Sequence, residues 1–492
     1  MKAPSITNLI FTFLLIFICP WQAYSDHHDD FIACLAVRSD NLTSISNIVY
    51  TRNNSSFLSV LQSSIRNPRF TSPSTRRPLL IVTPVHESQI QDVVLCARDN
   101  GLQIRTRSGG HDYEGLSYRT LHVPFIILDL VSLSEITIDL EHETAWVQTA
   151  ATVGQLYYAI SQRSRRLAFP AGGIPTIGVG GHFSGGGYGP MLRKFGLAAD
   201  HVIDARLVNV NGTILDRKSM GEDLFWAIRG GGGASFGVIT AWKIRLNTGE
   251  SGERSTIQAT FTSLFLGGVD RLIPLLQQRF PELGVRREDC NEVSWVQSTL
   301  LFSGYPVEGS TEVLTNRVPL SNFYFKGKSD YVQEPIPQQG FEGLWRLWGQ
   351  AEADMANMIM TPYGGRMSEI SESALPFPHR ANNLYKILHL VNWNESGEAA
   401  SERHINWTRR TYAYLAPFVS KSPRAAYVNY RDLDLGINND GNTSYAQASV
   451  WGFRYFKNNF KRLVRVKTKV DPGNFFRNEQ SIPPMSSWSR KN

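Results

Sequence analysis

Cysteine is scarce in this chain: only four occur in 492 residues, and none lies in a group with the spacing of metal ligands. No His-Glu-x-x-His sequence is present either. Cys19 belongs to an apolar N-terminal segment that we expect to be removed. Cys34, Cys96 and Cys290 then remain as one pair and one spare thiol. The sequence therefore predicts one disulfide and no metal site.

Two common phosphate-binding motifs are also missing. No Gly-x-Gly-x-x-Gly occurs in a strand-to-helix turn, and no glycine-rich loop ends in Lys-Ser or Lys-Thr. Residues 233–237 match the nucleophile elbow of hydrolases, but that motif needs a strand before its serine and a helix after it. Around Ser235 we expect the reverse order. We therefore exclude a serine hydrolase and expect any nucleotide to be held in another kind of site.

No segment beyond the N-terminus is long and apolar enough to span a bilayer. Lys2, the apolar run 9–19 and small residues at 23–25 have the pattern of a signal peptide, which we assign to residues 1–25. The mature protein would enter the secretory pathway and reach the extracellular space (the apoplast) or the vacuole. Candidate glycosylation sites agree with this route: Asn41, Asn53, Asn54, Asn211, Asn394, Asn406 and Asn442.

Acidic residues are fewer than basic ones, and the formal net charge is +7. Many basic residues lie between Arg454 and Lys469, where a solvated basic face accounts for them. We expect no nucleic-acid partner for a secreted protein, while an anionic small substrate stays open. The 11 Trp, 18 Tyr and 26 Phe suffice to line a large apolar pocket, although many of them belong to the core.

Glycine, in contrast, is abundant and is concentrated over residues 169–189, which we call the glycine segment. A flexible linker would carry Ser, Pro and charge, whereas Ile174, Ile177, Phe183 and Tyr188 lie between these glycines. Glycine is useful where a backbone needs positive φ or must approach another group closely. We therefore expect no regular helix or strand here and interpret the segment as the cradle of a bulky ligand.

Hydrophobic patterning predicts strands and helices in both halves of the chain, without an internal repeat. The polar octet 247–254 is the expected boundary between two regions. A hairpin should turn at Asn211-Gly212. We expect strands at 78–83, 103–107, 125–128, 136–139, 145–149, 202–210, 213–215, 238–246, 256–261 and 427–435, and helices at 90–97, 153–163, 224–228, 269–279, 341–351 and 446–464.

A second glycine-rich loop follows the strand 103–107 and reads Ser108-Gly-Gly-His111-Asp-Tyr113. A lone loop histidine usually has no function. His111 is nevertheless a candidate, because it lies in a glycine-built loop of a chain that has a second glycine segment. Tyr430 is a candidate acid or base, provided that a positive or electron-poor neighbour lowers its pKa.

These segments resemble those of plant berberine bridge enzyme-like flavoproteins, near their tetrahydrocannabinolic acid synthase branch. The resemblance covers nearly the whole chain and rests on motifs at 107–118, 169–189, 222–233, 370–380, 429–434 and 470–480. It implies an α+β fold with an FAD-binding domain of the vanillyl-alcohol-oxidase (PCMH) type and a second α+β domain with an antiparallel sheet over the substrate. We expect the FAD-binding domain at 26–246, the substrate domain at 247–440 and a C-terminal segment at 441–492 that returns to the FAD-binding domain.

The resemblance also implies roles for single residues. It implies FAD with a single covalent link from His111 to the flavin 8α-methyl carbon, and a disulfide between Cys34 and Cys96. Tyr430 matches the base that acts while a hydride leaves for the flavin, and Tyr113 and Tyr188 match active-site tyrosines. Cofactor contacts are expected from Ser108, Gly109, Gly110, His111, Gly172, Ile174, Thr176, Gly178, Gly180, Gly181, His182, Gly186, Val238 and Asn429.

The chain departs from the family pattern in three respects. Ile174 stands where members with two flavin links carry cysteine, so a second link is chemically impossible. Leu388 stands where the family often places Gln or Glu, and leucine cannot move a proton. Relatives have a strand, a helix and a strand where this chain has only the octet 247–254, so the second domain is expected to be shortened. In addition, Ile177 matches a position that helps to gate oxygen.

The leading hypothesis is a monomeric, secreted, FAD-linked oxidoreductase of plant specialised metabolism. It would take a hydride from a small apolar aromatic or prenylated substrate, with O2 as the acceptor. The losses at Ile174 and Leu388 favour an alternative, a flavin-scaffolded cycloaddition (Diels–Alderase-like) without net oxidation, in which the protein orients two reactants. The third hypothesis is an inactive product of a truncated gene.

Overall fold

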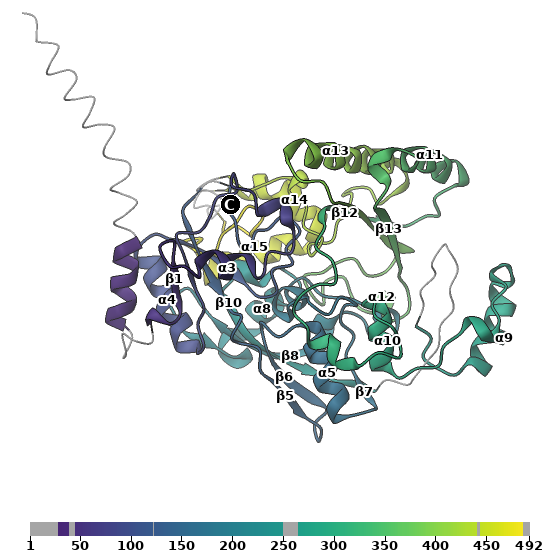
Figure 1. Ribbon diagram of the computed structural model, residues 1–492, viewed down its shortest axis with the longest axis horizontal. Coiled ribbons are helices and arrows are strands. Elements are labelled where there is room, and N and C mark those ends of the chain that lie inside the picture. The colour runs from purple at the N-terminus through teal and green to yellow at the C-terminus, as the bar shows by residue number, and fades with distance from the viewer. Residues whose placement is uncertain (1–27, 39–44, 122, 249–263, 440–442, 486–492) are drawn as a thin grey trace, which may run out of the picture.

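The computed structural model of the protein describes residues 28–38, 45–121, 123–248, 264–439 and 443–485 (Figure 1). The expected signal peptide, the expected strand at 256–261, most of the octet 247–254, and Asn41 and Asn442 lie outside these residues.

The N-terminal part is built on a four-stranded sheet in the order β1-β2-β4-β3. β2, β4 and β3 are parallel to one another, and β1 is antiparallel to β2. Every residue of β4 is buried, as expected for a parallel strand that is covered on both faces. The predicted strand–helix–strand unit is confirmed. The elements are β1 (Val49–Thr51), α3 (Phe57–Gln62), β2 (Leu80–Val82), α4 (Glu87–Asp99), β3 (Gln103–Arg107) and β4 (Phe125–Asp129).

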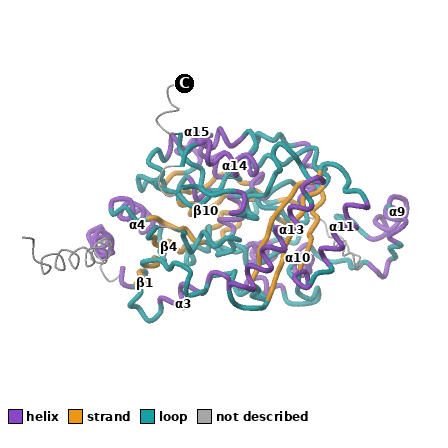
Figure 2. Tube along the Cα trace, turned by 90° about the horizontal axis from the view of Figure 1, so that it is seen from above, coloured by secondary structure: helices purple, strands orange, loops and turns teal. Residues whose placement is uncertain are grey.

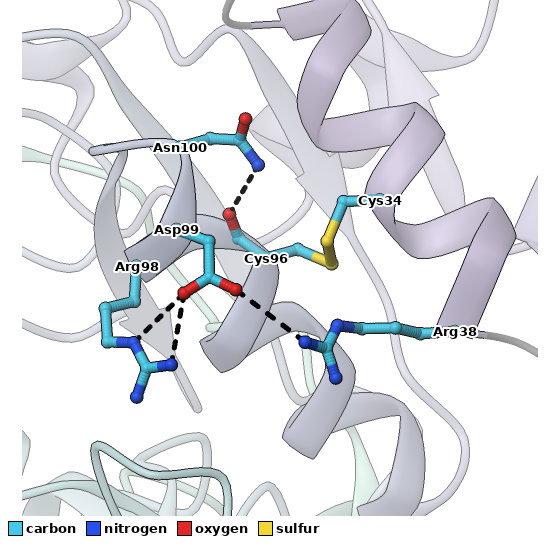
Figure 3. The surroundings of a disulfide bond; sticks show 6 residues. All are labelled: Cys34, Arg38, Cys96, Arg98, Asp99 and Asn100. Carbon is cyan, nitrogen blue, oxygen red and sulfur yellow. Dashed lines mark hydrogen bonds and ion pairs between the residues drawn. A yellow bond between two sulfur atoms is a disulfide. The ribbon is translucent and has the colours of Figure 1, made fainter.

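A disulfide between Cys34 and Cys96 ties the helix at 28–38 to α4, which confirms the expected pairing (Figure 3). The two Cα atoms are 5.7 Å apart, within the usual range for a disulfide. One turn further on, Arg38 lies 3.7 Å from Asp99. The side-chain amide of Asn100 donates a hydrogen bond of 2.8 Å to the Cys96 carbonyl and closes the end of α4. Among the described residues, Cys290 is the free cysteine.

A second, antiparallel sheet has five strands in the order β5-β6-β10-β8-β9. Its predicted hairpin is confirmed: β8 pairs with β9, and Gly212 in the turn has a φ of +70°. β7 and β11 pair antiparallel and form a separate two-stranded sheet. The elements are β5 (Ile136–Asp139), β6 (Thr144–Gln148), α5 (Val153–Arg163), β7 (Leu167–Ala168), β8 (Val202–Val208), β9 (Ile214–Leu215), α8 (Arg217–Ile228), β10 (Val238–Arg245) and β11 (Asn247–Thr248).

The expectation that the glycine segment holds no regular structure is wrong. A short helix, α6 (Val179–Ser184), forms inside it. Val179 and Phe183 lie one turn apart and are fully buried in the core cluster of the five-stranded sheet. Burial of two such side chains outweighs the helix-propensity cost of about 1 kcal/mol for each glycine.

The second region contains a three-stranded antiparallel sheet in the order β12-β14-β13, and α11 and α13 lie along one face of it (Figures 1 and 2). Ile387, Val391 and Trp393 of β14 point to these helices, and the Trp393 ring stacks on His404 of α13. Leu388 and Leu390 alternate with them and face a cavity on the other side. The elements are β12 (Tyr324–Val332), α11 (Gln338–Trp348), β13 (Ala356–Pro362), β14 (Tyr385–Trp393) and α13 (Glu398–Tyr414).

Two expectations about the C-terminal part are also wrong. The predicted strand 427–435 is a loop that ends in a 3-10 turn, because side chains rather than a neighbouring strand bind its backbone. Ser329 Oγ accepts a hydrogen bond from the N–H of Tyr427, and the hydroxyl of Tyr455 accepts one from the N–H of Asp432. The predicted helix 446–464 is two helices, broken at Lys457, whose φ is +44°. They are α14 (Tyr445–Phe456) and α15 (Asn459–Val470).

The remaining helices are short or lie at the periphery: α7 (Leu192–Phe195), α9 (Val269–Arg279), α10 (Trp295–Phe302) and α12 (Arg366–Glu369). Within the described residues, no helix is long and apolar enough to cross a membrane, and no group of three or more His, Cys, Asp or Glu side chains could hold a metal ion.

Candidate functional site

One cavity of about 1570 Å³ lies where the two glycine-rich loops, the three-stranded sheet and the C-terminal loop meet. The loop 108–113 and the glycine segment form one side of it. Strands β13 and β14 and helix α11 contribute the opposite side, and residues 427–431 join the two. The segments that sequence analysis singled out are therefore brought together around a single space.

At Gly109 and Gly178 the two loops pack backbone against backbone. A Cβ atom on Gly109 would collide with the backbone of Gly178, and one on Gly178 would collide with Ser108. The carbonyl of Thr149 accepts hydrogen bonds from the N–H of Gly180 (3.0 Å) and from the hydroxyl of Ser108 (2.7 Å). At Gly181, in contrast, a Cβ would meet nothing within 4 Å. The two loops are thus packed tightly against each other, and at Gly181 the backbone borders open space without a side chain.

His111 lies at this junction. Its Nε2 is 2.9 Å from the Thr176 hydroxyl. The enclosed position, helped by the positive charge of Arg66, lowers the pKa of His111 to about 3. The imidazole is therefore neutral at physiological pH, and a neutral ring nitrogen is the form that can make a covalent bond to a carbon atom.

Tyr113, Tyr188 and Tyr430 lie close together on the cavity side of the three-stranded sheet. The hydroxyls of Tyr188 and Tyr430 contact each other, and the ring of Tyr113 lies 5.3 Å from that of Tyr430. Gly327 of β12 leaves room for Tyr113, since a Cβ there would lie 2.6 Å from its ring. All three predicted tyrosines thus belong to one cluster, although 242 residues separate Tyr188 from Tyr430.

Lys386 of β14 completes the tyrosine cluster, and sequence analysis missed it. Its Nζ has no hydrogen-bond partner among the described residues and lies 3.2 Å from the ring centroid of Tyr188, 4.3 Å from that of Tyr427 and 4.9 Å from that of Tyr430. An ammonium group over aromatic faces is an attractive arrangement. The available signal was a lysine next to the apolar run Ile387-Leu388.

Burial shifts the pKa values of Tyr430 and Lys386 in opposite directions. It raises the pKa of Tyr430 well above its usual value, and the neighbouring Tyr188 and Tyr113 raise it further. Burial alone lowers the pKa of Lys386 well below its usual value. Each group therefore resists charge by itself. A proton that moves from the Tyr430 hydroxyl to the Lys386 amine would create two opposite charges that stabilise each other.

His182 and Asn429 hold the glycine segment against the C-terminal loop. His182 Nε2 accepts a hydrogen bond of 3.0 Å from the N–H of Gly172, so Nδ1 carries the proton of the neutral ring. Burial, with a smaller effect of Lys386, lowers the pKa of His182 to about 4. The Asn429 amide donates a 3.0 Å hydrogen bond to the carbonyl of His182.

The chemistry of the cavity wall fits FAD. Arg105 lines the cavity and is 3% exposed, yet its Nε and Nη1 have no partner among the described residues, although Nη2 binds Glu479 at 2.9 Å. Unpaired buried guanidinium atoms suit an anionic ligand such as a pyrophosphate. The side-chain-free backbone at Gly181 suits a flat ring system, and the neutral imidazole of His111 suits a covalent bond to a carbon atom of that ring system.

The side of the cavity that faces the three-stranded sheet is apolar. Leu388, which is 4% exposed, contributes to it together with its cross-strand partner Ile359, Leu390 and Phe325. At the rim, Trp345 and Ile174 remain 60% and 51% exposed. Ile174 thus lines the cavity as expected.

The cavity is lined by all three predicted tyrosines and by twelve of the fourteen expected cofactor residues. The other two, Gly186 and Val238, are not among its lining residues. Val238 is fully buried in the core cluster of the four-stranded sheet, between the cavity-lining residues Gly237 and Ile239.

The described glycosylation candidates Asn53, Asn54, Asn211, Asn394 and Asn406 are all exposed.

Comparison with known proteins gives matches along nearly the whole chain. Residues 78–217 match the family described as FAD binding domain, and residues 426–483 match that described as berberine and berberine like. A tetrahydroberberine oxidase from Berberis wilsoniae is 50% identical over 511 residues, which cover 94% of this chain and 95% of that protein.

Solved structures agree with this result. BBE-like 28 from Arabidopsis thaliana superposes with a TM-score of 0.86 at 44% identity, over 93% of this chain and 100% of that one. Phl p 4, a grass pollen allergen with glucose dehydrogenase activity, superposes with a TM-score of 0.87 at 41% identity over the same shares. A Phl p 4 variant in which valine replaces one isoleucine is described as a glucose oxidase.

Proposed function

This chain belongs to the berberine bridge enzyme-like family of FAD-linked oxidoreductases, and from that premise we propose that it oxidises a small apolar aromatic or prenylated substrate by hydride transfer. The observation that carries the proposal is the cluster of Tyr430, Tyr188 and Lys386 next to an apolar cavity wall. The glycine segment and the His111 loop lie on the other side of the same cavity.

Bound FAD would supply a two-electron acceptor at the substrate. His111 would hold its ring covalently through Nδ1, the nitrogen that does not contact the Thr176 hydroxyl, while Thr176 orients the imidazole through Nε2. Arg105 would bind the negatively charged part of the cofactor. Since Ile174 has no thiol, His111 is the single attachment point in this proposal.

Tyr430 is the proposed base. It would take a proton from the substrate while the substrate loses its hydride, and Lys386 would hold the proton that leaves the tyrosine hydroxyl beforehand. The contact between the hydroxyls of Tyr188 and Tyr430 supports a shared negative charge. Leu388 excludes water from this place but moves no proton.

The proposed substrate is recognised mainly by apolar contact. Leu388, Leu390, Ile359 and Phe325 offer surface to an aromatic or prenyl group. Among relatives, the named substrates are as different as tetrahydroberberine and glucose. The apolar wall supports a substrate nearer to the former in polarity. O2 is the proposed acceptor, with Ile177, which lines the cavity, as the gate.

A flavin-scaffolded cycloaddition is the second candidate, favoured by Leu388 in place of a polar residue. It would use the same apolar wall to orient two reactants without net oxidation. Formation of peroxide together with a product two hydrogens lighter than the substrate would exclude it.

We also propose secretion, with a signal peptide at 1–25, an FAD-binding domain at 26–246, a substrate domain at 247–440 and a returning segment at 441–492. The exposed glycosylation candidates and the disulfide support an extracellular or vacuolar location.

The decisive experiment combines two measurements on the secreted protein. Acid precipitation should leave a yellow pellet, and the His111→Ala variant should give a colourless one, because free FAD stays in the supernatant. The protein should then be mixed anaerobically with tetrahydroberberine, a prenylated phenolic acid or D-glucose, each in a separate experiment. The two apolar compounds should bleach the flavin absorbance faster than D-glucose does. A colourless wild-type pellet would contradict the covalent link, and failure to bleach with every compound would contradict the oxidation.

A further inference from the structure

An ion pair joins the neighbours of the two residues to which the proposed function gives the main roles. Arg431 Nε donates a hydrogen bond of 2.9 Å to Asp112 Oδ2, although the two residues are 319 positions apart. Asp112 directly follows His111, and Arg431 directly follows Tyr430. The contact therefore connects the loop of the attachment residue with the loop of the proposed base.

Asp112 also organises its own loop. Its Oδ1 accepts hydrogen bonds from the backbone N–H of Glu114 (3.0 Å) and of Leu116 (3.1 Å). One carboxylate thus fixes the turn with one oxygen and reaches the other loop with the second. Arg431 lines the cavity, and its Nη1 is buried without a partner among the described residues. The guanidinium therefore depends on Asp112 for its side-chain contact.

A second, fully buried connection runs parallel to the first. Lys326 of β12 contacts Glu114 from the His111 loop and lies 2.9 Å from Asp432 of the Tyr430 loop. Lys328 binds the other oxygen of Asp432 at 2.6 Å and Asp434 at 2.8 Å. Besides the Tyr113–Tyr430 ring contact, charged groups thus join the same two loops in two places, once through the sheet and once directly at the cavity.

We propose that Asp112 and Arg431 are positioning residues, whose ion pair sets the place of Tyr430 relative to His111. Because the two loops have no backbone pairing in common, side-chain contacts must determine their separation. Catalytic groups need a geometry accurate to about 0.5 Å, which a loop reaches only when surrounding contacts lock it. The catalytic meaning of the pair rests on the proposed roles of His111 and Tyr430, whereas the coupling of the two loops does not.

Hydrogen–deuterium exchange on the purified holoprotein tests the coupling without any substrate. Asp112→Asn keeps an oxygen for the N–H groups of Glu114 and Leu116 but removes the charge that binds Arg431. We expect about three- to tenfold faster exchange in peptides over both 109–116 and 429–436. Arg431→Met should accelerate the same two peptides. Arg431→Lys, which keeps the charge, should restore part of the protection.

The double variant Asp112→Asn/Arg431→Met should exchange no faster than the faster single variant, since both substitutions remove one contact. The matched control is Arg462→Met, which removes a surface pair with Asp223 of 2.7 Å and should change neither peptide. Acceleration confined to the loop that carries the substitution, or effects that multiply in the double variant, would overturn the proposal. Failure of the protein to retain FAD would instead contradict the proposed function.

Discussion

At the scale of single residues, the chemistry depends on side chains held in unusual environments. Lys386 is fully buried among three tyrosine rings, and the half-buried Tyr430 contacts the Tyr188 hydroxyl and lies against the Tyr113 ring. Sequence analysis identified Tyr430 as a candidate acid or base, provided that a positive or electron-poor neighbour lowers its pKa. The structure places the Lys386 amine 4.9 Å from the centroid of the Tyr430 ring. Lys386 belongs to β14, a strand that the sequence did not reveal.

Replacing Lys386 by Met tests this pairing. The pKa of Tyr430 is raised, so the active deprotonated form grows as pH rises, and the rate of anaerobic flavin bleaching should increase with pH. Without the amine, the tyrosinate loses its counter-charge, and the midpoint of this profile should move up by about one pH unit or more. Lys461→Met, on the exposed face of α15, is the control. An unchanged midpoint in Lys386→Met would exclude the lysine from the proton transfer.

Oxygen access should depend on Ile177, whose side chain lines the cavity while its carbonyl is held by the N–H of Val153 at 2.8 Å. Ile177→Val removes one methyl group without disturbing this backbone contact. We expect the reduced flavin to react with O2 on the order of tenfold faster, measured by stopped-flow mixing, which corresponds to about 1.4 kcal/mol in the barrier. Ile359→Val, at the cavity rim on β13, provides the comparison. Equal acceleration in both variants would contradict a specific gate.

At the scale of elements, β12 shows how tertiary contacts make a strand from polar residues. Its sequence, Tyr-Phe-Lys-Gly-Lys-Ser-Asp-Tyr-Val, lacks the alternation of a half-buried strand. Lys326 and Lys328 are nevertheless buried, because acidic residues from two other loops neutralise them. Burial by itself would raise the pKa of Glu114, but Lys326 and nearby arginines outweigh it and keep this pKa low.

Lys326→Met should therefore destabilise the protein strongly. It removes the positive charge that balances the buried carboxylates of Glu114 and Asp432. Removing one partner of a buried ion pair costs about 3–5 kcal/mol. Urea unfolding followed by tryptophan fluorescence should show this loss as a lower midpoint. The exposed substitution Lys461→Met should change the free energy of unfolding by less than about 0.5 kcal/mol. A Lys326→Met midpoint like that of the control would mean that the buried cluster adds no stability.

The whole molecule joins distant segments around one cavity, and this makes its stability sensitive to acid. Burial, and to a lesser degree Lys386, lowers the pKa of His182 to about 4, and burial also lowers that of His379 well below its usual value. For Glu479, burial by itself would raise the pKa, but Arg105, backbone N–H groups such as that of Leu121, and Arg119 together outweigh it and keep the pKa low. In the unfolded chain these groups would titrate near their ordinary values.

The melting temperature should therefore fall as the pH falls. Below about pH 6.5 the unfolded state takes up protons on histidines that stay neutral in the folded state, so each such group removes stability at about 1.4 kcal/mol per pH unit. For His182 this window runs down to about pH 4, and the carboxylates add to the loss below about pH 4.5. Differential scanning fluorimetry from pH 7.5 to 4 would measure it. His182→Gln should flatten the slope, whereas the exposed His142→Gln should not.

The sequence by itself determined those features that depend on local rules. Periodicity, apolar runs and turn residues predicted most of the strands and helices from β2 to β10, but not β7, α6 or α7. Glycine content marked the cradle, and the motifs marked His111 and Tyr430. It misjudged α6 and the loop 427–435, where burial or side-chain hydrogen bonds override local propensity.

Only the tertiary structure decided how these parts act together. It placed Lys386 among the tyrosines, paired Arg431 with Asp112, and showed that Gly109 and Gly178 serve the packing of the two glycine-rich loops against each other. These contacts join residues from opposite ends of the chain, and a local pattern carries no information about which distant side chain will share a cavity. The physical reason is that burial and charge pairing depend on three-dimensional neighbours, while propensity depends on neighbours in sequence.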